Sequence, residues 1–552
     1  LVCWWRRFWC AGRKQRCRIE VIITFDPFLD RINMIFRSVS LILASLALVD
    51  GFALQPSGFK RQSSQLSMGG WPWEYQARLL DVFKIPVKAD DPRFPSMLIG
   101  FNQRFKAENA KAVYMPQNPQ EVAVAMDDIL DNYKTGLKVR SGGHCYENFV
   151  MNEGTNGIID VGDLVDWGQD QRGYYLSSGE TNWSAFNKIF KHWGVVLPGG
   201  SCYSVGLGGH ISGGGDGIMS RLYGTTVDWL TGIEIVVKDD PDQPAYVKYV
   251  GEKSEGDDAD LFWACKGAGN GNFGVITKYY FKELPKAPEG AVISTLAFNW
   301  HDDDGNVILD AESLKRILDE YVDFAARNDN RESSGKFQIY HEAAGQALMT
   351  IHTAYFNDTT KCEAKKFHYE LQKKLEEFYT VSTPIGAFGG GHIGYCVGRS
   401  KNFKDIEDAV EDTIHDFTFY DSTQTMNPSG GNQRGKYKSA YMKERFPIEQ
   451  CEAIIDNMRR VPEGLEMHDM KQSICQIDCF GGRINDFTPE ETALAQRDYV
   501  VKLQFQTYWV DEDKDDLHLG WIRKFYHEDM YGQYGGIPDP KQSDMFEGCY
   551  YN

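Results

Sequence analysis

Two glycine-rich loops hold the residues of this 552-residue chain whose types and spacing favour covalent ligand chemistry. The first, KVRSGGHCYE, spans residues 138–147, and the second, PGGSCYSVGLGGHISGGGDGIMSRLYGTT, spans residues 198–226. Dense glycine permits positive φ and lets backbone N–H groups approach a ligand closely, which suits a diphosphate. Each loop also carries one nucleophile, His144 or Cys202, able to bond an electron-poor ring. A thiolate near loop N–H groups is expected to have a lowered pKa.

Each nucleophile also has a plainer interpretation. An isolated histidine is usually a hydrogen-bonded structural residue, and an isolated cysteine usually behaves as a small buried hydrophobe. The glycine-flanked positions of His144 and Cys202, each after a predicted strand, favour the binding interpretation because a loop offers little core packing.

Other familiar motifs are absent or misplaced. Residues 269–274, GNGNFG, match G-x-G-x-x-G, but the β-branched and aromatic residues that follow predict a strand, whereas a nicotinamide-binding loop opens a helix. No G-x-x-x-x-G-K-S/T and no G-x-S-x-G occurs, which excludes a P-loop and an α/β-hydrolase. The twelve cysteines form no C-x-x-C pair, so we expect no metal site.

The net charge of −19 argues against nucleic-acid binding and stable membrane association, because both need a basic surface. The plainer interpretation of this acidity is that it aids solubility.

The first glycine-rich loop follows a predicted strand–helix–strand unit. Residues 112–115 read as a strand, and Asn118-Pro119 with Glu121 is typical of a helix start. The strand at 137–139 then delivers the His144 loop at its end, where α/β units favour ligands. Further strands are predicted at 157–161, 174–179 and 232–238, with a helix at 183–193.

After Pro285 the pattern changes to long strands alternating with amphipathic helices, which predicts a second domain built on an antiparallel sheet. We predict a binding domain at 90–284, a substrate domain at 285–500, and at 501–552 a C-terminal return towards the first domain, truncated at its end.

The N-terminal region predicts targeting rather than fold. Residues 1–33 do not begin with Met and are interpreted as an upstream extension. Residues 34–51 have the basic start, apolar core and small residues of a signal peptide. Residues 52–89 are a linker or a transit-peptide-like segment, so the predicted destination is secretion or, through a bipartite leader, a plastid.

Four motifs carry a family resemblance: RSGGHCYENFV, the second glycine-rich loop, DLFWACKGAGNGNFGVITKYYF and GCYYN. Together they resemble the berberine-bridge-enzyme-like branch of FAD-linked oxidases, in the vanillyl-alcohol oxidase superfamily. The likeness covers about residues 90–552 and is nearest to aclacinomycin oxidoreductase and glucooligosaccharide oxidase. It implies an α+β, two-domain PCMH-type FAD-binding fold, with helices flanking the antiparallel sheet of the substrate domain.

The resemblance implies that FAD is bound bicovalently, through His144 to the 8α-methyl group and through Cys202 to the neighbouring ring carbon. It also implies a larger set of residues around the diphosphate, adenosine and isoalloxazine. These residues are Arg140, Ser141, Gly142, Gly143, Tyr146, Val205, Gly206, Gly208, Gly209, His210, Gly213, Gly271, Asn272, Phe273, Gly274 and Ile276.

For catalysis the resemblance implies a tyrosine base, for which Tyr550 and the adjacent Tyr551 are the candidates, with Asp478 as the activating acid. A phenol with a pKa near ~10 needs such a neighbour. A carboxylate in a solvated loop is the other interpretation of Asp478. Asp216 stands where relatives have tyrosine, which changes the expected substrate pocket.

The expected reaction is hydride transfer from an alcohol carbon of a sugar, glycoside or bulky secondary metabolite to the flavin, with O2 reduced to H2O2. Val205 favours the oxidase because relatives admit oxygen beside a small aliphatic residue there, although it also has a simple packing interpretation. A dehydrogenase with another acceptor and a flavin-carrying protein without turnover are the alternatives.

Overall fold

The computed structural model describes residues 86–552 apart from 270, 381–404, 426–430 and 551–552. The expected upstream extension, the signal peptide and nearly all of the segment that follows it lie outside the described residues, as does Tyr551. Among the residues that are described, no helix has the length and apolar character needed to cross a bilayer.

A small parallel sheet, in the order β1-β3-β2, carries the first glycine-rich loop. The helix that connects its first two strands begins as predicted, because the Asn118 side chain accepts a hydrogen bond from the Glu121 N–H and Pro119 occupies the first turn. The elements are β1 (Ala112–Tyr114), α4 (Pro119–Tyr133), β2 (Leu137–Arg140) and β3 (Gly157–Asp160).

A five-stranded sheet, in the order β4-β5-β8-β6-β7 with antiparallel neighbours, completes the first domain. The second glycine-rich loop begins after α5 (Asn182–Trp193) and includes the short α6 (Leu207–Ser212). The G-x-G-x-x-G run leads into strand β8 and not into a helix, as predicted. The strands are β4 (Trp167–Asp170), β5 (Gly173–Ser177), β6 (Gly232–Val237), β7 (Tyr246–Gly251) and β8 (Val275–Phe281).

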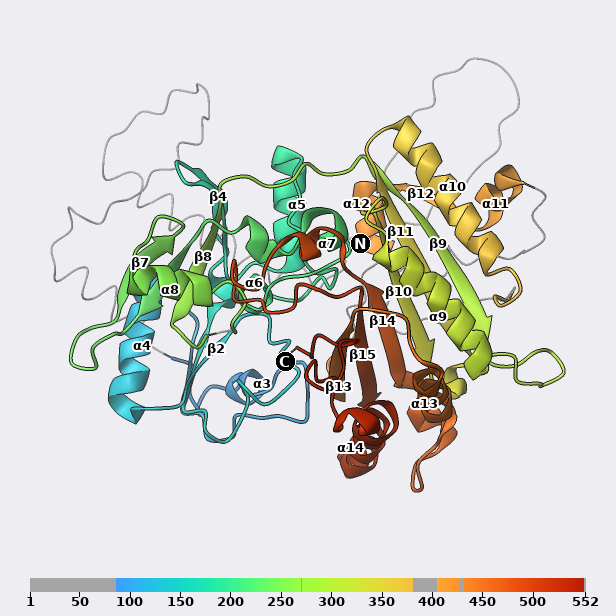
Figure 1. Cartoon of the computed structure of the whole chain (residues 1–552). Helices are drawn as coiled ribbons and strands as arrows, with labels where there is room; N and C mark the ends of the chain where they lie inside the picture. The colour runs from blue at the N-terminus through green and yellow to red at the C-terminus, as the bar shows by residue number, and fades with distance from the viewer. Residues whose placement is uncertain (1–85, 270, 381–404, 426–430, 551–552) are drawn as a thin grey trace, which may run out of the picture. The chain divides into compact units, whose positions relative to one another are not determined.

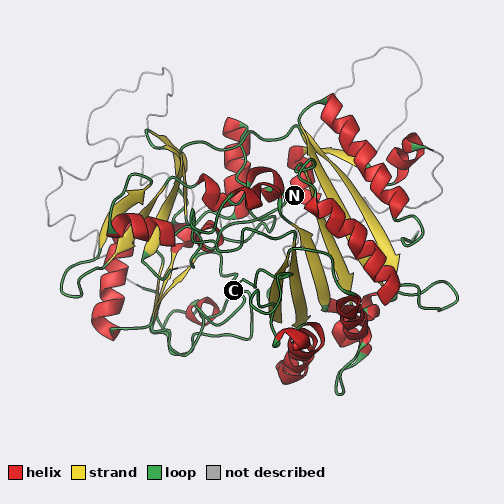
Figure 2. Ribbon diagram, viewed as in Figure 1, coloured by secondary structure: helices red, strands yellow, loops and turns green. Residues whose placement is uncertain are grey.

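The second domain is a seven-stranded antiparallel sheet in the order β12-β9-β11-β10-β14-β15-β13, with helices packed on it (Figures 1 and 2). The α+β, two-domain prediction is therefore confirmed. The strands are β9 (Gly290–Asn299), β10 (Ser333–Tyr340), β11 (Gln346–Tyr355), β12 (His415–Thr418), β13 (Arg434–Met442), β14 (Ile474–Cys479) and β15 (Val501–Trp509). The main helices are α9 (Ala311–Ala326), α10 (Asp358–Lys374), α13 (Ile448–Arg459) and α14 (Asp515–Arg523).

The two faces of this sheet differ because side chains alternate along each strand. Phe337, Ile477, Leu503 and Phe505 share one hydrophobic core with residues of the helices. The residues between them point to the opposite face, which is polar and forms one wall of the cavity described below.

The predicted domain of the segment that begins at residue 501 differs from the one observed. The segment from residue 501 was expected to return to the first domain, but β15 pairs with β13 on one side and β14 on the other. Its apolar residues Leu503 and Phe505 complete the core of the second domain, which explains why the strand remains there.

Candidate active site

A cavity of about 1380 Å³ is lined by both glycine-rich loops and by the polar face of the seven-stranded sheet. This volume exceeds the range of roughly 300–1000 Å³ that is usual for drug-sized ligands. The cavity therefore has room for a dinucleotide as well as a second small molecule.

His144 lies in this cavity on the loop that follows β2. Its Nε2 is 2.9 Å from the Ser204 hydroxyl, and Phe101 stacks on its ring with the centroids 5.1 Å apart. Burial lowers the pKa of His144, which favours the neutral imidazole. A neutral ring nitrogen is the form that acts as a nucleophile.

Cys202 lies two residues before Ser204, so the His144–Ser204 contact joins the two predicted nucleophile loops. The loops also meet backbone to backbone: a Cβ on Gly142 would lie 2.4 Å from the Gly206 nitrogen. Only glycine permits this approach. The two loops therefore lie side by side, and His144 and Cys202 both line the cavity.

The expected lowering of the Cys202 pKa is wrong for the described state. Burial raises the pKa of this thiol, with a further contribution from the Asp478 carboxylate, and these effects outweigh the favourable fields of Lys336 and Lys502. The loss of hydration on burial is the largest of these effects, because it disfavours the charged thiolate.

Most of the predicted cofactor residues line the cavity. Phe273 does not: its side chain is 42% exposed, although its neighbours Asn272 and Gly274 are in the lining. The other members of the set that line the cavity are Arg140, Ser141, Gly142, Gly143, Tyr146, Val205, Gly206, Gly208, Gly209, His210, Gly213, Gly271 and Ile276.

Two of the predicted diphosphate residues have protein partners. The Arg140 guanidinium donates to Asp160 at 2.8 Å and to the Met97 carbonyl. His210 accepts a hydrogen bond from the Gly200 N–H at 2.7 Å. Both residues therefore also hold the loops in shape, and the backbone is left to supply much of the ligand contact.

The predicted base, Tyr550, reaches the cavity from the C-terminal end of the described chain. Its backbone N–H donates to the Ser439 hydroxyl at 3.1 Å, while its phenol oxygen is buried without a hydrogen-bond partner among the described residues. Burial raises the pKa of Tyr550 well above 10, and Tyr146 and Tyr441 add to this shift. The phenol is therefore protonated in this state.

Asp478 lines the same cavity, but no hydrogen bond joins it to Tyr550 in the described part of the chain. Its carboxylate accepts from the Gln476 amide at 2.9 and 3.0 Å. Burial raises the pKa of Asp478, opposed by Lys336 and Lys502. In this geometry Asp478 therefore does not activate Tyr550 through a direct hydrogen bond.

The sequence interpretation missed the polar sheet wall itself. Two rows of cross-strand neighbours face the cavity, a charged row and a glutamine row. The charged row is Lys336–Asp478–Lys502, and the glutamine row is Gln338–Gln476–Gln504. The strict alternation in KFQIY, CQIDC and VKLQFQTYW is the signal that predicts a strand with one polar face.

Aromatic hydroxyls extend this wall. Tyr146 stacks on Tyr437 with the ring centroids 3.7 Å apart, and the hydroxyls of Tyr437 and Tyr508 are 2.5 Å apart. Tyr508 donates in turn to Gln506 at 2.8 Å, and Gln506 donates to Gln504 at 2.9 Å. The wall therefore presents a connected set of hydrogen-bonding groups.

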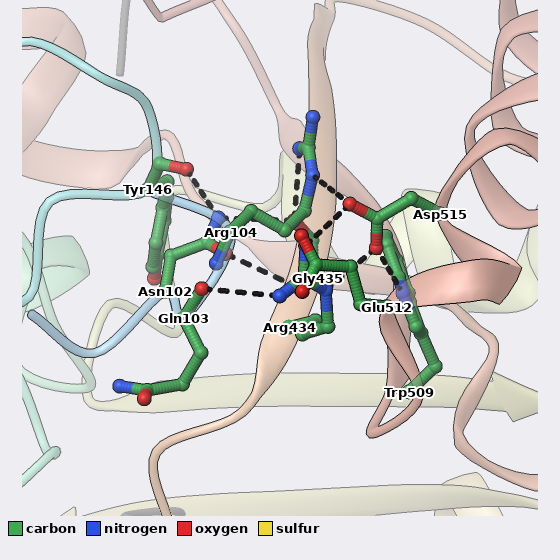
Figure 3. Close-up of polar contacts among 9 residues, drawn as sticks. All are labelled: Asn102, Gln103, Arg104, Tyr146, Arg434, Gly435, Trp509, Glu512 and Asp515. Atoms are coloured by element: carbon green, nitrogen blue, oxygen red, sulfur yellow. Dashed lines mark hydrogen bonds and ion pairs between the residues drawn. The ribbon is translucent and has the colours of Figure 1, made fainter. Parts of the chain in front are cut away.

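Asn102, which no sequence motif indicated, joins the His144 loop to the second domain (Figure 3). Its amide donates to the Tyr146 carbonyl at 2.7 Å and to the Gly435 carbonyl at 3.0 Å. Beside it, Asp515 accepts two hydrogen bonds from Arg434, at 2.6 and 2.5 Å (Figure 3). This cluster fixes the start of β13 against the His144 loop.

The donor set fits a flavin dinucleotide. The backbone-rich surface has room for a diphosphate, since Gly143 and Gly271 adopt positive φ and line the cavity without a Cβ. The predicted nucleophiles His144 and Cys202 both line this cavity. No cluster of metal-ligating side chains is found among the described residues.

Residues 110–240 match the family model described as an FAD binding domain. A hexose oxidase of Chondrus crispus is 48% identical over 472 residues, covering 84% of this chain and 85% of that protein. Berberine bridge enzyme-like 21 of Arabidopsis thaliana is 32% identical over 461 residues, covering 79% and 74% of the two chains. The chain belongs to the berberine-bridge-enzyme-like family of FAD-linked oxidases.

The solved structure of aclacinomycin oxidoreductase has the same fold, with a TM-score of 0.70 and 25% identity, covering 84% of this chain and 89% of that one. These comparisons confirm the resemblance to FAD-linked oxidases. They also confirm the predicted FAD-dependent oxidation of CH–OH groups with oxygen as acceptor.

Proposed function

We propose that this FAD-linked oxidase acts on a hexose or a related small sugar, with the flavin bonded through both His144 and Cys202. The contact between His144 and Ser204 carries the proposal, because it brings the two nucleophile loops into one cavity. The sugar preference is supported by the 48% identical hexose oxidase and by the polar sheet wall opposite those loops.

Bound FAD supplies a two-electron acceptor that takes the hydride of the alcohol carbon and passes its electrons to O2, giving H2O2. The Ser204 hydroxyl is hydrogen-bonded to Nε2 of His144, so Nδ1 is the ring nitrogen that remains for the covalent bond. Each covalent bond would replace one C–H bond of the flavin and the N–H or S–H bond of the side chain, and the two electrons released would pass through the flavin to O2. Lys336 and Lys502 favour loss of the Cys202 thiol proton.

Tyr550 is the proposed acceptor of the hydroxyl proton. Its phenol oxygen is buried and has no hydrogen-bond partner among the described residues, so its capacity to donate and accept is unused. Because burial holds its proton in the described state, its ionisation has to be driven by the occupied site rather than by Asp478. Tyr551 remains the alternative base and lies outside the described residues.

Acid precipitation tests the covalent part of the proposal. The wild-type pellet should retain yellow flavin, each of the variants His144→Ala and Cys202→Ala should retain it through the remaining bond, and the double variant should release it. Cys145→Ala is the matched control, since this neighbouring thiol also lines the cavity and should leave attachment unchanged. Free flavin in the wild-type supernatant would disprove covalent attachment.

Turnover is tested separately by offering neutral hexoses and measuring flavin bleaching without oxygen and H2O2 formation in air. Bleaching without rapid reoxidation would indicate a dehydrogenase. If no sugar or other alcohol bleached the flavin, the chain would be a flavin carrier without turnover.

A further inference from the structure

The sheet wall of the cavity carries three charged side chains, and a fourth charged side chain reaches it from the second glycine-rich loop. Lys336, Asp478 and Lys502 are direct cross-strand neighbours on β10, β14 and β15. The fourth, Asp216, belongs to the second glycine-rich loop and accepts from the Lys502 ammonium at 2.6 Å. All four line the cavity, and we call them the charge-balanced row.

The row is held firmly in place. Lys502 is 7% exposed, and its ammonium lies 4.5 Å from the centre of the Phe480 ring in addition to its contact with Asp216. Burial favours loss of the Lys502 proton, but Asp216 and Asp478 outweigh it and raise the pKa of this group. Burial alone would raise the pKa of Asp216, but the Lys502 ammonium outweighs burial and the pKa is lowered. Both groups are therefore charged at neutral pH.

With Asp478 ionised as well as Asp216, the two cations and two carboxylates of the row leave no net charge at the wall. Beside the row lie Gln338, Gln476 and Gln504, which offer neutral donors and acceptors to hydroxyl groups. A carboxylate on the ligand would meet Asp216 or Asp478 as well as a lysine, and an ammonium would meet a lysine as well as a carboxylate. In a partly dehydrated cavity such like-charge contacts are costly.

We propose that the charge-balanced row is a filter for substrate charge, which selects neutral polyhydroxy rings over the corresponding uronates and amino sugars. This proposal rests on the proposed sugar oxidation and names the class of sugar that the site accepts. Specificity arises here from repulsion of the wrong substrate as much as from attraction of the right one.

Replacing one charged member of the row by a neutral residue makes the wall either positive or negative, depending on which member is replaced. Asp216→Asn leaves two cations and one carboxylate, so the wall becomes positive and should favour a uronate. Lys336→Met leaves one cation and two carboxylates, so the wall becomes negative and should favour an amino sugar. Lys502→Met also removes one cation, so it too makes the wall negative.

The experiment measures kcat/KM for three forms of one hexose: the neutral sugar, its 6-carboxylate and its 2-amino derivative, at a pH where the amine is protonated. We expect Asp216→Asn to raise the uronate-to-neutral ratio by roughly tenfold, and Lys336→Met to raise the amino-to-neutral ratio similarly. The double variant Asp216→Asn/Lys502→Met keeps one cation and one carboxylate and should return to the neutral preference. It also leaves neither member of the ion pair buried alone, so it tests the proposal even if a single variant does not fold.

Asp303→Asn and Lys541→Met are the matched controls, because both residues are exposed outside the cavity and change the total charge by the same amounts. If the single variants keep the wild-type ratios, or if the double variant shifts them as strongly as a single one, the filter does not exist. If the wild type oxidises none of the three forms, the proposed sugar oxidation fails instead, so the two failures are distinguishable.

Discussion

Arg221 provides a direct test of how the second glycine-rich loop is fixed to the substrate domain. It lies on α7 (Ser220–Tyr223), is 1% exposed, and donates to main-chain carbonyls across the domain boundary. Its Nε is 2.7 Å from the Ser333 oxygen, and another of its nitrogens donates to the carbonyls of Ala325 and Phe480. Methionine in its place retains much of the aliphatic volume but none of these donors.

The expected cost follows from those acceptors. A buried carbonyl that loses its partner costs about 1–3 kcal/mol. Three such carbonyls give roughly 3–9 kcal/mol, and removing a buried cation recovers part of its dehydration cost. We therefore expect Arg221→Met to destabilise the protein by about 3–5 kcal/mol, and Arg221→Lys, which keeps the charge and some donors, by less.

Thermal unfolding of the FAD-loaded protein, followed by flavin fluorescence, measures this effect. For a chain of this size about 2 °C or less is expected per kcal/mol, so Arg221→Met should melt roughly 5 °C lower. Arg316→Met is the matched control, because the Arg316–Glu377 ion pair is largely exposed and should contribute little. Equal melting temperatures for Arg221→Met and Arg316→Met would refute the reasoning.

Three further predictions concern the site. Tyr550→Phe should slow anaerobic flavin reduction at least about 100-fold with flavin content unchanged; an unchanged stopped-flow rate would exclude this phenol as the base. Asn102→Leu should lower the fraction of flavin bonded to His144, measured by acid precipitation in a Cys202→Ala background, because it breaks both links of the loop to β13; full attachment would show that these links are dispensable. Burial lowers the pKa of His352 from 6.5 to about 4. The free energy of unfolding should therefore be higher by about 3 kcal/mol above pH 6.5, and this stabilisation should be lost as the pH falls from 6.5 towards 4. Melting curves across this range should fall less steeply for His352→Gln than for the wild type, and identical slopes would contradict the assignment.

The sequence was informative where the determinants are local. The Asn118 cap with Pro119 predicted the start of α4, and the strand at 137–139 correctly delivered the His144 loop to the edge of its sheet. The two glycine-rich loops predicted a ligand cavity because, in each loop, the flexible glycines and the reactive side chain lie within one short stretch of sequence.

The substrate wall could not be derived in this way. Lys336, Asp478 and Lys502 lie on three strands far apart in the chain, and only the register of β10, β14 and β15 makes them neighbours. The pairing of Lys502 with Asp216 spans 286 positions and joins two domains. Likewise the Asp478 carboxylate accepts from Gln476 on its own strand, and no hydrogen bond joins it to Tyr550 among the described residues.

By itself, then, the sequence determined the two loops, their nucleophiles and the kind of fold, since glycine content, capping residues and strand alternation act over a few neighbouring residues. The tertiary structure alone decided the charges that face the substrate and the protonation of Cys202 and Tyr550. Those properties depend on burial and on electrostatic fields from distant segments, which exist only once the sheet is assembled.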